Sequence, residues 1–113
     1  MRLVESIRHF GQAAFADVLK DEIGRQKGLL PLERFCQYGG FPSYDDVSVH
    51  VDGFQAVGNG DVEVRCSVYF TEVVSSNCAV CSFEQPASGF LLLSIGEDGN
   101  TDIVDAERAC EAD

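Results

Sequence analysis

The chain has 113 residues and a net charge of −11, and 45% of its residues are hydrophobic. That is enough apolar material for one folded core, so a single domain spanning residues 1–113 is expected. Charge is uneven: residues 1–34 hold six bases and five acids, whereas residues 35–113 hold two bases and fourteen acids. Such a chain repels phosphate backbones, which argues against direct nucleic-acid binding, and it would favour encounter with a protein that has a basic surface. The alternative is that the charge serves solubility alone.

Residues 1–27 predict a helix with one apolar side. That side is formed by residues three and four positions apart: Leu3, Ile7, Phe10, Ala14 and Val18, continued by Phe15, Leu19 and Ile23. Gly11 is a weak helix former and predicts a break between an N-terminal turn and the main helix. Charges interrupt MRLVESIRHF, unlike a secretory signal, and no apolar run approaches the roughly 20 residues that span a bilayer. A cytoplasmic protein without membrane contact is therefore expected.

Residues 28–46 predict a packed connection and no long element. Pro31, Pro42 and the pair Gly39-Gly40 interrupt regular structure, although the segment is rich in leucine and aromatic residues. A short helical turn is expected at residues 31–36.

From residue 47 the apolar period changes to two, which predicts strands. Val47, Val49 and Val51 alternate with polar residues until Asp52-Gly53, where a bulge is expected because Phe54 falls out of phase. The turn GNGD (58–61) leads into the clearest strand, residues 62–71, whose even-numbered residues are apolar. EQPASG (84–89) predicts a loop, residues 90–95 a strand, residues 97–100 a turn and residues 101–107 another strand. A short final helix at residues 104–110 is the alternative.

This order of elements predicts an α+β fold. An N-terminal helix would pack on a four- to five-stranded antiparallel meander sheet in two layers, because a sheet with one face in water needs cover on the other. Cystatin-like and NTF2-like folds share this layout by analogy only, and the analogy implies no function.

Three segments carry a family resemblance: QKGLLPLERF, the strand VEVRCSVYFTEVV with cysteines just beyond it, and the hairpin FLLLSIGEDGNTDIVDAE. Over roughly residues 14–107 the chain resembles a group of small acidic bacterial proteins. In that group a helix precedes a leucine-proline-leucine segment, and a strand leads into a cysteine-containing loop. The chain departs from the group in the wider spacing of Cys78 and Cys81 and in lacking a cysteine beside Phe90. The resemblance implies a fold and no activity.

Cys78 and Cys81 form a CxxC pair among five cysteines, an odd number that is unlike a disulfide scaffold. As zinc ligands they would need two more residues from the remaining candidates: Cys36, Cys66, Cys110, His9 and His50. Cys66 falls on the apolar side of its strand, and no second CxxC exists. A redox pair normally begins a helix, which Pro86 and Gly89 argue against here. The simpler interpretation is reduced thiols that pack as small apolar side chains, with no cofactor.

Four polar residues are candidates for a ligand site: His50, Asp52, Tyr69 and Glu72. His50 and Asp52 are two positions apart, which places both on one side of a strand. In a curved sheet such groups would line a pocket between helix and sheet and exchange protons with a ligand. The alternative is a solvated strand face. The chain has no serine elbow, phosphate loop or HExxH motif, and its Asp-rich turns lack the spacing of a calcium loop.

We therefore interpret the chain as a small acidic binding protein without catalysis, of inhibitor or immunity type. It would bind a basic protein through its acidic sheet face and loops. One alternative is a small-ligand binder or enzyme with a pocket at those four residues, and another is a metal-binding module at Cys78 and Cys81. Homodimerisation stays open, because an apolar strand such as residues 90–95 invites pairing if it lies at a sheet edge.

Overall fold

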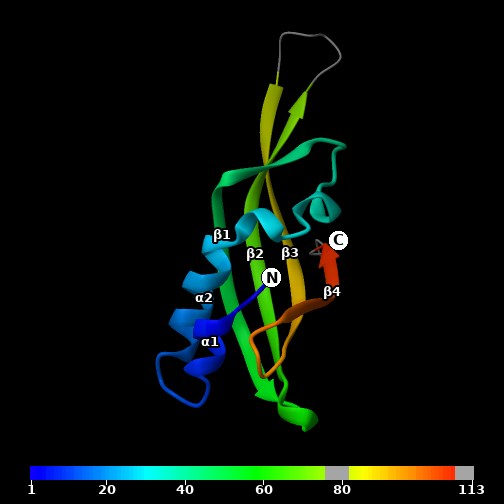
Figure 1. The fold of residues 1–113 in the computed structure, drawn as a ribbon. Helices are drawn as coiled ribbons and strands as arrows, with labels where there is room; N and C mark the ends of the chain where they lie inside the picture. Colours follow the sequence, from blue (N-terminus) through cyan, green and yellow to red (C-terminus); the bar gives the residue numbers. More distant parts are fainter. Residues whose placement is uncertain (76–81, 109–113) are drawn as a thin grey trace.

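The computed structural model describes residues 1–75 and 82–108, which form an α+β fold in two layers (Figure 1). The sheet is antiparallel, with four strands in chain order: β1 (Phe41–Ala56), β2 (Val62–Ser75), β3 (Ser82–Ile95) and β4 (Thr101–Arg108). Helical elements lie on one face: α1 (Val4–Arg8), α2 (Phe15–Arg25) and the 3-10 turns η1 (Lys27–Leu29) and η2 (Leu32–Phe35). A further turn, η3 (Gly58–Gly60), joins β1 to β2. The predicted helical layer on a meander sheet is confirmed.

The N-terminal helix is broken at the predicted glycine. Gly11 has a φ of +91°, a left-handed conformation that glycine adopts at little cost. Glu22 of α2 then supplies the N-terminal cap that α1 lacks. Its carboxylate accepts hydrogen bonds from the backbone N–H groups of Glu5 (3.2 Å) and Ser6 (2.8 Å) and from the Ser6 hydroxyl (2.6 Å). These bonds satisfy free N–H groups of α1 and fix it on α2.

The connection after α2 packs onto the sheet, as predicted, but it ends at residue 40. The expectation of a connection up to residue 46 is wrong, because residues 41–43 pair with β2 and belong to β1. The helical turn of the connection forms at η2, and the Phe35 side chain at the end of that turn is fully buried. The Phe35 ring lies directly on Gly89 of β3, because a Cβ atom at Gly89 would be 2.5 Å from a ring carbon. Gly89 therefore allows an aromatic ring to contact the sheet backbone, which is a recurrent use of glycine within strands.

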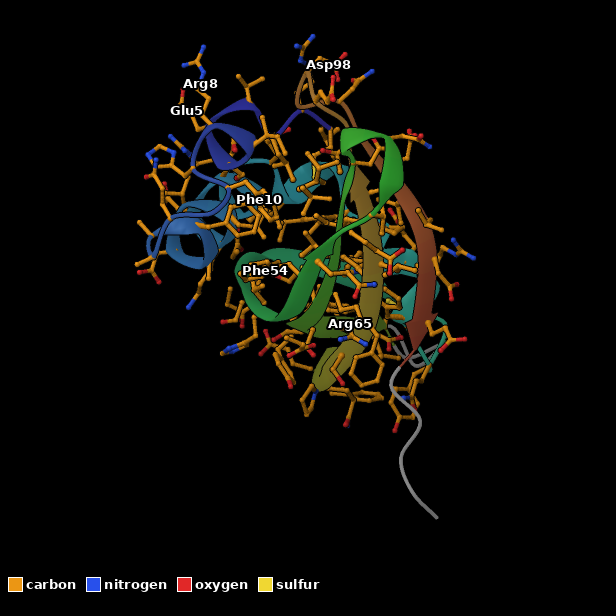
Figure 2. All side chains as sticks on the ribbon, turned by 90° about the horizontal axis from the view of Figure 1, so that it is seen from below. Glu5, Arg8, Phe10, Phe54, Arg65 and Asp98 are labelled. Atoms are coloured by element: carbon orange, nitrogen blue, oxygen red, sulfur yellow. The ribbon has the colours of Figure 1, made fainter. Side chains whose placement is uncertain are left out.

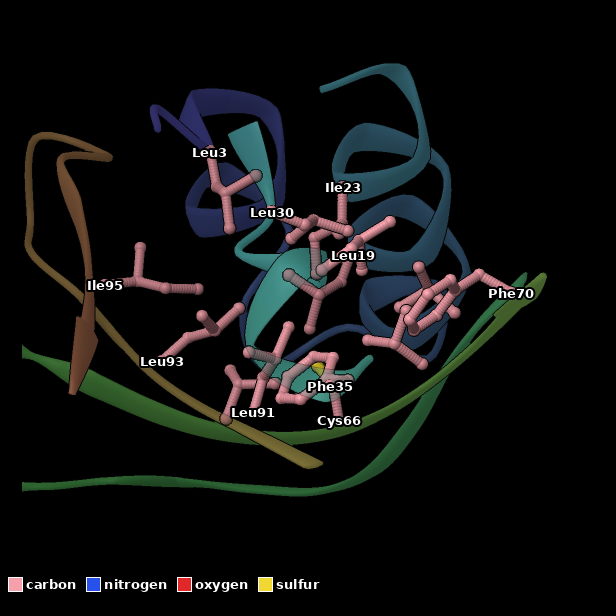
Figure 3. Packing of buried hydrophobic residues seen from close by; sticks show 14 of the residues in the cluster. Leu3, Leu19, Ile23, Leu30, Phe35, Cys66, Phe70, Leu91, Leu93 and Ile95 are labelled. Carbon is pink, nitrogen blue, oxygen red and sulfur yellow. The ribbon is translucent and has the colours of Figure 1, made fainter. Parts of the chain in front are cut away.

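The face of the sheet beneath the helices, the inner face, is apolar. On β2 its buried side chains are the even-numbered ones: Val62, Val64, Cys66, Val68 and Phe70. On β3 they are Leu91, Leu93 and Ile95, which pair directly with Cys66, Val64 and Val62. The helical layer contributes Leu3, Phe15, Leu19, Ile23, Leu30, Leu32 and Phe35 (Figure 3). The alternation predicted for residues 62–71 is confirmed, and it places every second side chain in one shared core.

The pairing of β1 with β2 is interrupted twice. Its register shifts between Ser43 and Ser48 and again between Val51 and Gly53, where the bulge was expected. After this second shift Phe54 turns toward the helices, and its ring centre lies 4.6 Å from that of Phe15. The bulge therefore restores the apolar phase of the strand.

In the C-terminal half one expectation is wrong, and the predicted strand at residues 101–107 is confirmed over its alternative. Residues 84–89 are not a loop but part of β3, where they pair with residues 68–73. Pro86 pairs with Thr71 of β2, and within residues 1–75 and 82–108 β4 pairs only with residues 89–95, so no described strand pairs with Pro86 on its other side. Residues 101–108 continue as β4 and do not turn into a final helix. The apolar strand 90–95 lies between β2 and β4, so it offers no free edge for pairing between copies.

Candidate functional site: the outer face of the sheet

The face of the sheet turned away from the helices, which we call the outer face, carries the polar half of the alternation. Strand register sets its residues in rows across all four strands: His50, Ser67, Phe90 and Glu107 in one row, and Gly53, Arg65, Leu92 and Asp105 in the next. Both helices lie on the opposite side of the sheet, whereas Arg65 points away from them (Figure 2). The outer face therefore presents aromatic, acidic and basic groups together.

A hollow of about 470 Å³ lies on this face. All four strands line it: Asp52 from β1, Arg65 and Cys66 from β2, Phe90, Leu91 and Leu92 from β3, and Asp105 and Glu107 from β4. Phe90 is 50% exposed, and Tyr69 on β2 is 48% exposed. These two side chains leave apolar area in water on the outer face, which a partner could cover. The described residues of the lining include three carboxylates and one guanidinium, so together they carry a negative charge.

Arg65 is the one base among the described residues that line this hollow. Its guanidinium lies over Gly53 of β1, because a Cβ atom at Gly53 would be 3.1 Å from Nη2 of Arg65. Because Gly53 has no side chain, the Arg65 side chain has space to cross β1 at the bulge. No carboxylate among residues 1–75 and 82–108 lies within 4.0 Å of this guanidinium. Arg65 is therefore open to an anionic or carbonyl group of a ligand.

Three of the four predicted ligand-site residues meet on the outer face. The rings of His50 and Tyr69 have centres 5.4 Å apart and are nearly perpendicular, at 81°, which is the edge-to-face arrangement that aromatic pairs prefer. Asp52 accepts a hydrogen bond from the Ser67 hydroxyl. Because these residues face away from the helices, a ligand that touches them would bind on the open sheet and not between helix and sheet.

Glu72 lies apart from these three residues, on the inner face. Its side chain is fully buried, and its carboxylate accepts hydrogen bonds from the backbone N–H groups of Gln37 (2.8 Å), Tyr38 (3.0 Å) and Gly40 (2.8 Å). Burial alone would raise the pKa of the Glu72 carboxyl, but the three N–H donors outweigh burial and hold that pKa below its ordinary value. Glu72 therefore anchors residues 37–40 to β2 as an ion.

The thiol of Cys66 belongs to the core. Burial, with a smaller contribution from the charge of Asp52, raises the pKa of this thiol to about 12. Burial also raises the pKa of the Cys36 thiol. Thiols of this kind stay protonated at neutral pH, and a protonated thiol is a poor nucleophile and metal ligand.

The predicted zinc site depends on cysteines that lie outside the described residues. Within residues 1–75 and 82–108, no group of three or more histidine, cysteine and acidic side chains could hold a metal ion. Cys78, Cys81 and Cys110 lie outside the described residues. The prediction of a site at Cys78 and Cys81 is therefore untested.

Sequence reasoning did not single out Arg65, Phe90 or Asp105. Arg65 stands at a polar position of the alternating strand 62–71. The alternation predicts which face of the sheet its side chain lies on, but not which residues of other strands lie beside it. Phe90 begins the apolar run FLLLSI, in which a period of two is hidden because residues on both faces are apolar. Only the pairing of β2, β3 and β4 shows that these side chains lie together.

Comparisons of the chain with protein-family models, with curated proteins and with solved structures gave no match. Within the described residues, no helix is both long enough and apolar enough to cross a membrane. The chemistry of the outer face is therefore the basis on which a function is proposed.

Proposed function

We propose that this chain is a small acidic cytoplasmic protein that acts by binding, as an inhibitor or immunity-type protein. The outer face of its sheet would receive a partner protein with a basic surface. The observation that carries this proposal is the half-exposed Phe90 ring at the centre of the outer face, with Asp52 on one side and Asp105 and Glu107 on the other.

This combination is typical of a contact surface. An exposed aromatic ring loses apolar area to water when a partner covers it, and such residues carry much of the binding energy at interfaces. Carboxylates around the ring select a basic partner and speed its approach. The net charge of −11 adds a long-range field of the same sign, which salt screens.

Affinity capture with outer-face variants tests this proposal. The tagged chain would be exposed to lysate at about 50 mM and about 200 mM salt, which shortens the screening length. We expect a basic protein to be recovered by the wild-type chain and lost with Phe90→Ser and with Asp105→Lys. Glu97→Lys is the matched control, because it makes the same charge change in an exposed turn at the end of the sheet.

The recovered protein would then be purified and its dissociation constant measured with each variant. Circular dichroism would confirm that every variant is folded. Recovery that is equal for the wild-type chain, Phe90→Ser and Asp105→Lys would contradict the proposal, as would binding that does not weaken with salt.

The hollow itself favours a second candidate, the binding of a small ligand. Phe90 and Leu92 offer apolar walls, and Arg65 offers a guanidinium without an ion pair among the described residues. A small neutral ligand with an apolar body and a carbonyl group for Arg65 fits this chemistry, because the three carboxylates of the lining would repel an anion. A thermal-shift screen of such neutral compounds tests it: a compound that stabilises the wild-type chain and not Arg65→Gln would support ligand binding.

A further inference from the structure

The two edge strands of the sheet differ in how readily a further strand could pair with them. The order β1-β2-β3-β4 leaves β1 and β4 at the edges, on opposite sides of the molecule (Figure 1). β4 is eight residues long, carries a register shift opposite Leu92 and Leu93, and packs against η2. It also bears three exposed acids, Asp102, Asp105 and Glu107. Short length, bulges and charges are the features that keep edge strands from pairing.

β1 lacks these features over its middle section. It is sixteen residues long, and residues 48–51 pair regularly with β2 between the two register shifts. With Val47 they form the uncharged sequence VSVHV, which is favourable for a strand. The backbone groups of residues 47–51 that point away from β2 make no hydrogen bond to any residue within 1–75 and 82–108. This edge can therefore accept another strand.

A groove of about 350 Å³ runs beside this edge, between β1 and α2. Val47, Ser48 and Val49 line it on one side, and Gly24 lines it on the other together with two acids and two bases of α2. A Cβ atom at Gly24 would meet no neighbouring side chain within 4 Å, so the helix leaves space at this point. Side chains of an added strand that point toward the helical layer would enter this groove.

The charges at both ends of the edge identify the occupant. Asp45 and Asp46 precede VSVHV and Asp52 follows it, and all three are exposed. A second copy pairing antiparallel about Val49 would bring Asp45 and Asp46 of each copy to the end of the other copy's edge that carries Asp52, and each copy has a net charge of −11. Like charges across strands are destabilising, whereas lysine or arginine at the ends of a foreign strand would meet these acids favourably.

We propose that residues 47–51 of β1 accept an extended segment of a partner protein, which adds to the sheet as a strand. The segment has uncharged β-formers at its centre and lysine or arginine at both ends. This inference rests on the proposed function for a basic protein partner, and it adds the form in which that partner binds. The outward side chains of the added strand would lie beside His50 and Ser48 and extend the outer face.

A synthetic peptide tests this inference on the chain as it stands. The probe is acetyl-KKVTVTVKK-amide, and the control peptide has proline in place of both threonines at the same charge, which prevents strand pairing. We expect the probe to bind at least about tenfold more tightly than the control by calorimetry. Hydrogen exchange should slow in residues 45–53 when the probe is bound. Equal affinities, no binding, or protection confined to another segment would overturn the inference.

A pair of variants on one strand locates the contact. Ser48→Lys adds a base inside the proposed edge, and Gln55→Lys adds the same charge further along β1 on the same outer face. We expect Ser48→Lys to weaken the probe by about tenfold and Gln55→Lys by less than about twofold. Equal weakening by both variants would mean that only net charge matters, and it would overturn the inference.

The two proposals fail separately. If the probe does not bind while a captured basic protein depends on Phe90, the edge inference is wrong and the proposed function stands. If the probe slows hydrogen exchange in residues 45–53 while Phe90→Ser recovers as much basic protein as the wild-type chain, the outer face is not the binding surface and the edge inference stands.

Discussion

Two phenylalanine rings lie on opposite faces of β3 at neighbouring positions of the strand. The ring of Phe35 covers Gly89 on the inner face and is fully buried, whereas the next residue, Phe90, projects from the outer face and is half exposed. The two rings have the same chemistry but different surroundings. Gly89 and Phe90 are consecutive residues of a strand, so the side of Gly89 that Phe35 covers and the Phe90 side chain lie on opposite faces of the sheet. The helical layer, and not residue type, therefore decides which aromatic groups stabilise the fold and which are free to contact a partner.

Acidic residues show the same contrast, buried on the inner face and exposed on the outer face. Glu72 is buried on the inner face with three N–H partners, and Asp105 is exposed on the outer face beside Arg65. A buried carboxylate is tolerated only when hydrogen bonds replace the water it has lost. Exposed carboxylates have no such requirement and remain available to a partner.

The largest expected effect is on the inner face, with Phe35→Ala. Removing this ring leaves a cavity between η2 and Gly89 in a core where Phe35 is fully buried. We expect the free energy of unfolding to fall by about 3–5 kcal/mol, as for other buried phenylalanines. Urea denaturation measures it. A loss below about 1 kcal/mol would show that η2 does not cover the core as described.

The second prediction concerns Glu72→Gln. The neutral amide removes a carboxylate that accepts three N–H hydrogen bonds and turns an N–H₂ group toward those donors. We expect unfolding free energy to fall by about 2–3 kcal/mol at neutral pH, since hydrogen bonds to charged groups are the stronger ones. Glu84→Gln, at an exposed acid on β3, is the control and should change stability by less than about 0.5 kcal/mol.

The effect of Glu72 also depends on pH, with a defined sign. Its carboxyl pKa is lowered in the folded chain, so its contribution is fully present above the unfolded pKa of about 4.3 and is lost as pH falls through the folded pKa. The difference in stability between wild type and Glu72→Gln should therefore shrink below about pH 4. A difference that stays constant down to strongly acidic pH would contradict an ionised Glu72.

Much of this contrast is readable from the sequence. The alternation of residues 62–71 and the phase change at Asp52-Gly53 predicted which side chains face inward and where β1 bulges, because the period of a strand is a local property. Glu72 stands at an even position, in phase with Phe70, but the predicted alternation ended at residue 71 and Glu72 was grouped with the polar candidates His50, Asp52 and Tyr69. Its partners at residues 37–40 could not be read, since that contact joins segments distant in the chain.

The outer face was harder to predict for the same reason. His50, Asp52 and Tyr69 were recognised as polar residues on strands, but the hollow depends on β3 and β4 lying beside β2. EQPASG has the composition of a loop, and it forms a strand because β2 offers it continuous partners. Pairing between strands is a tertiary property, which overrides local preference.

A smaller effect is expected from Glu22→Gln in the helical layer. The amide oxygen still accepts a hydrogen bond, but the charge that favours the N-terminus of α1 is lost. We expect a loss of about 1 kcal/mol, close to that of a removed helix cap. Hydrogen exchange should quicken in residues 4–8 more than in β2, and uniform quickening would mean that Glu22 supports the whole core and not α1.

The smallest effect on stability is expected from Phe90→Ala, which completes the comparison with Phe35. Half of the Phe90 ring is already in water, so its removal deletes little buried area and leaves no closed cavity. We expect unfolding free energy to change by less than about 1 kcal/mol, while binding to a captured basic partner weakens by at least about tenfold. Urea denaturation and titration calorimetry measure the two quantities on the same variant. If Phe90→Ala destabilised the chain as much as Phe35→Ala, the ring would be part of the core, and its exposure could not be assigned to a partner.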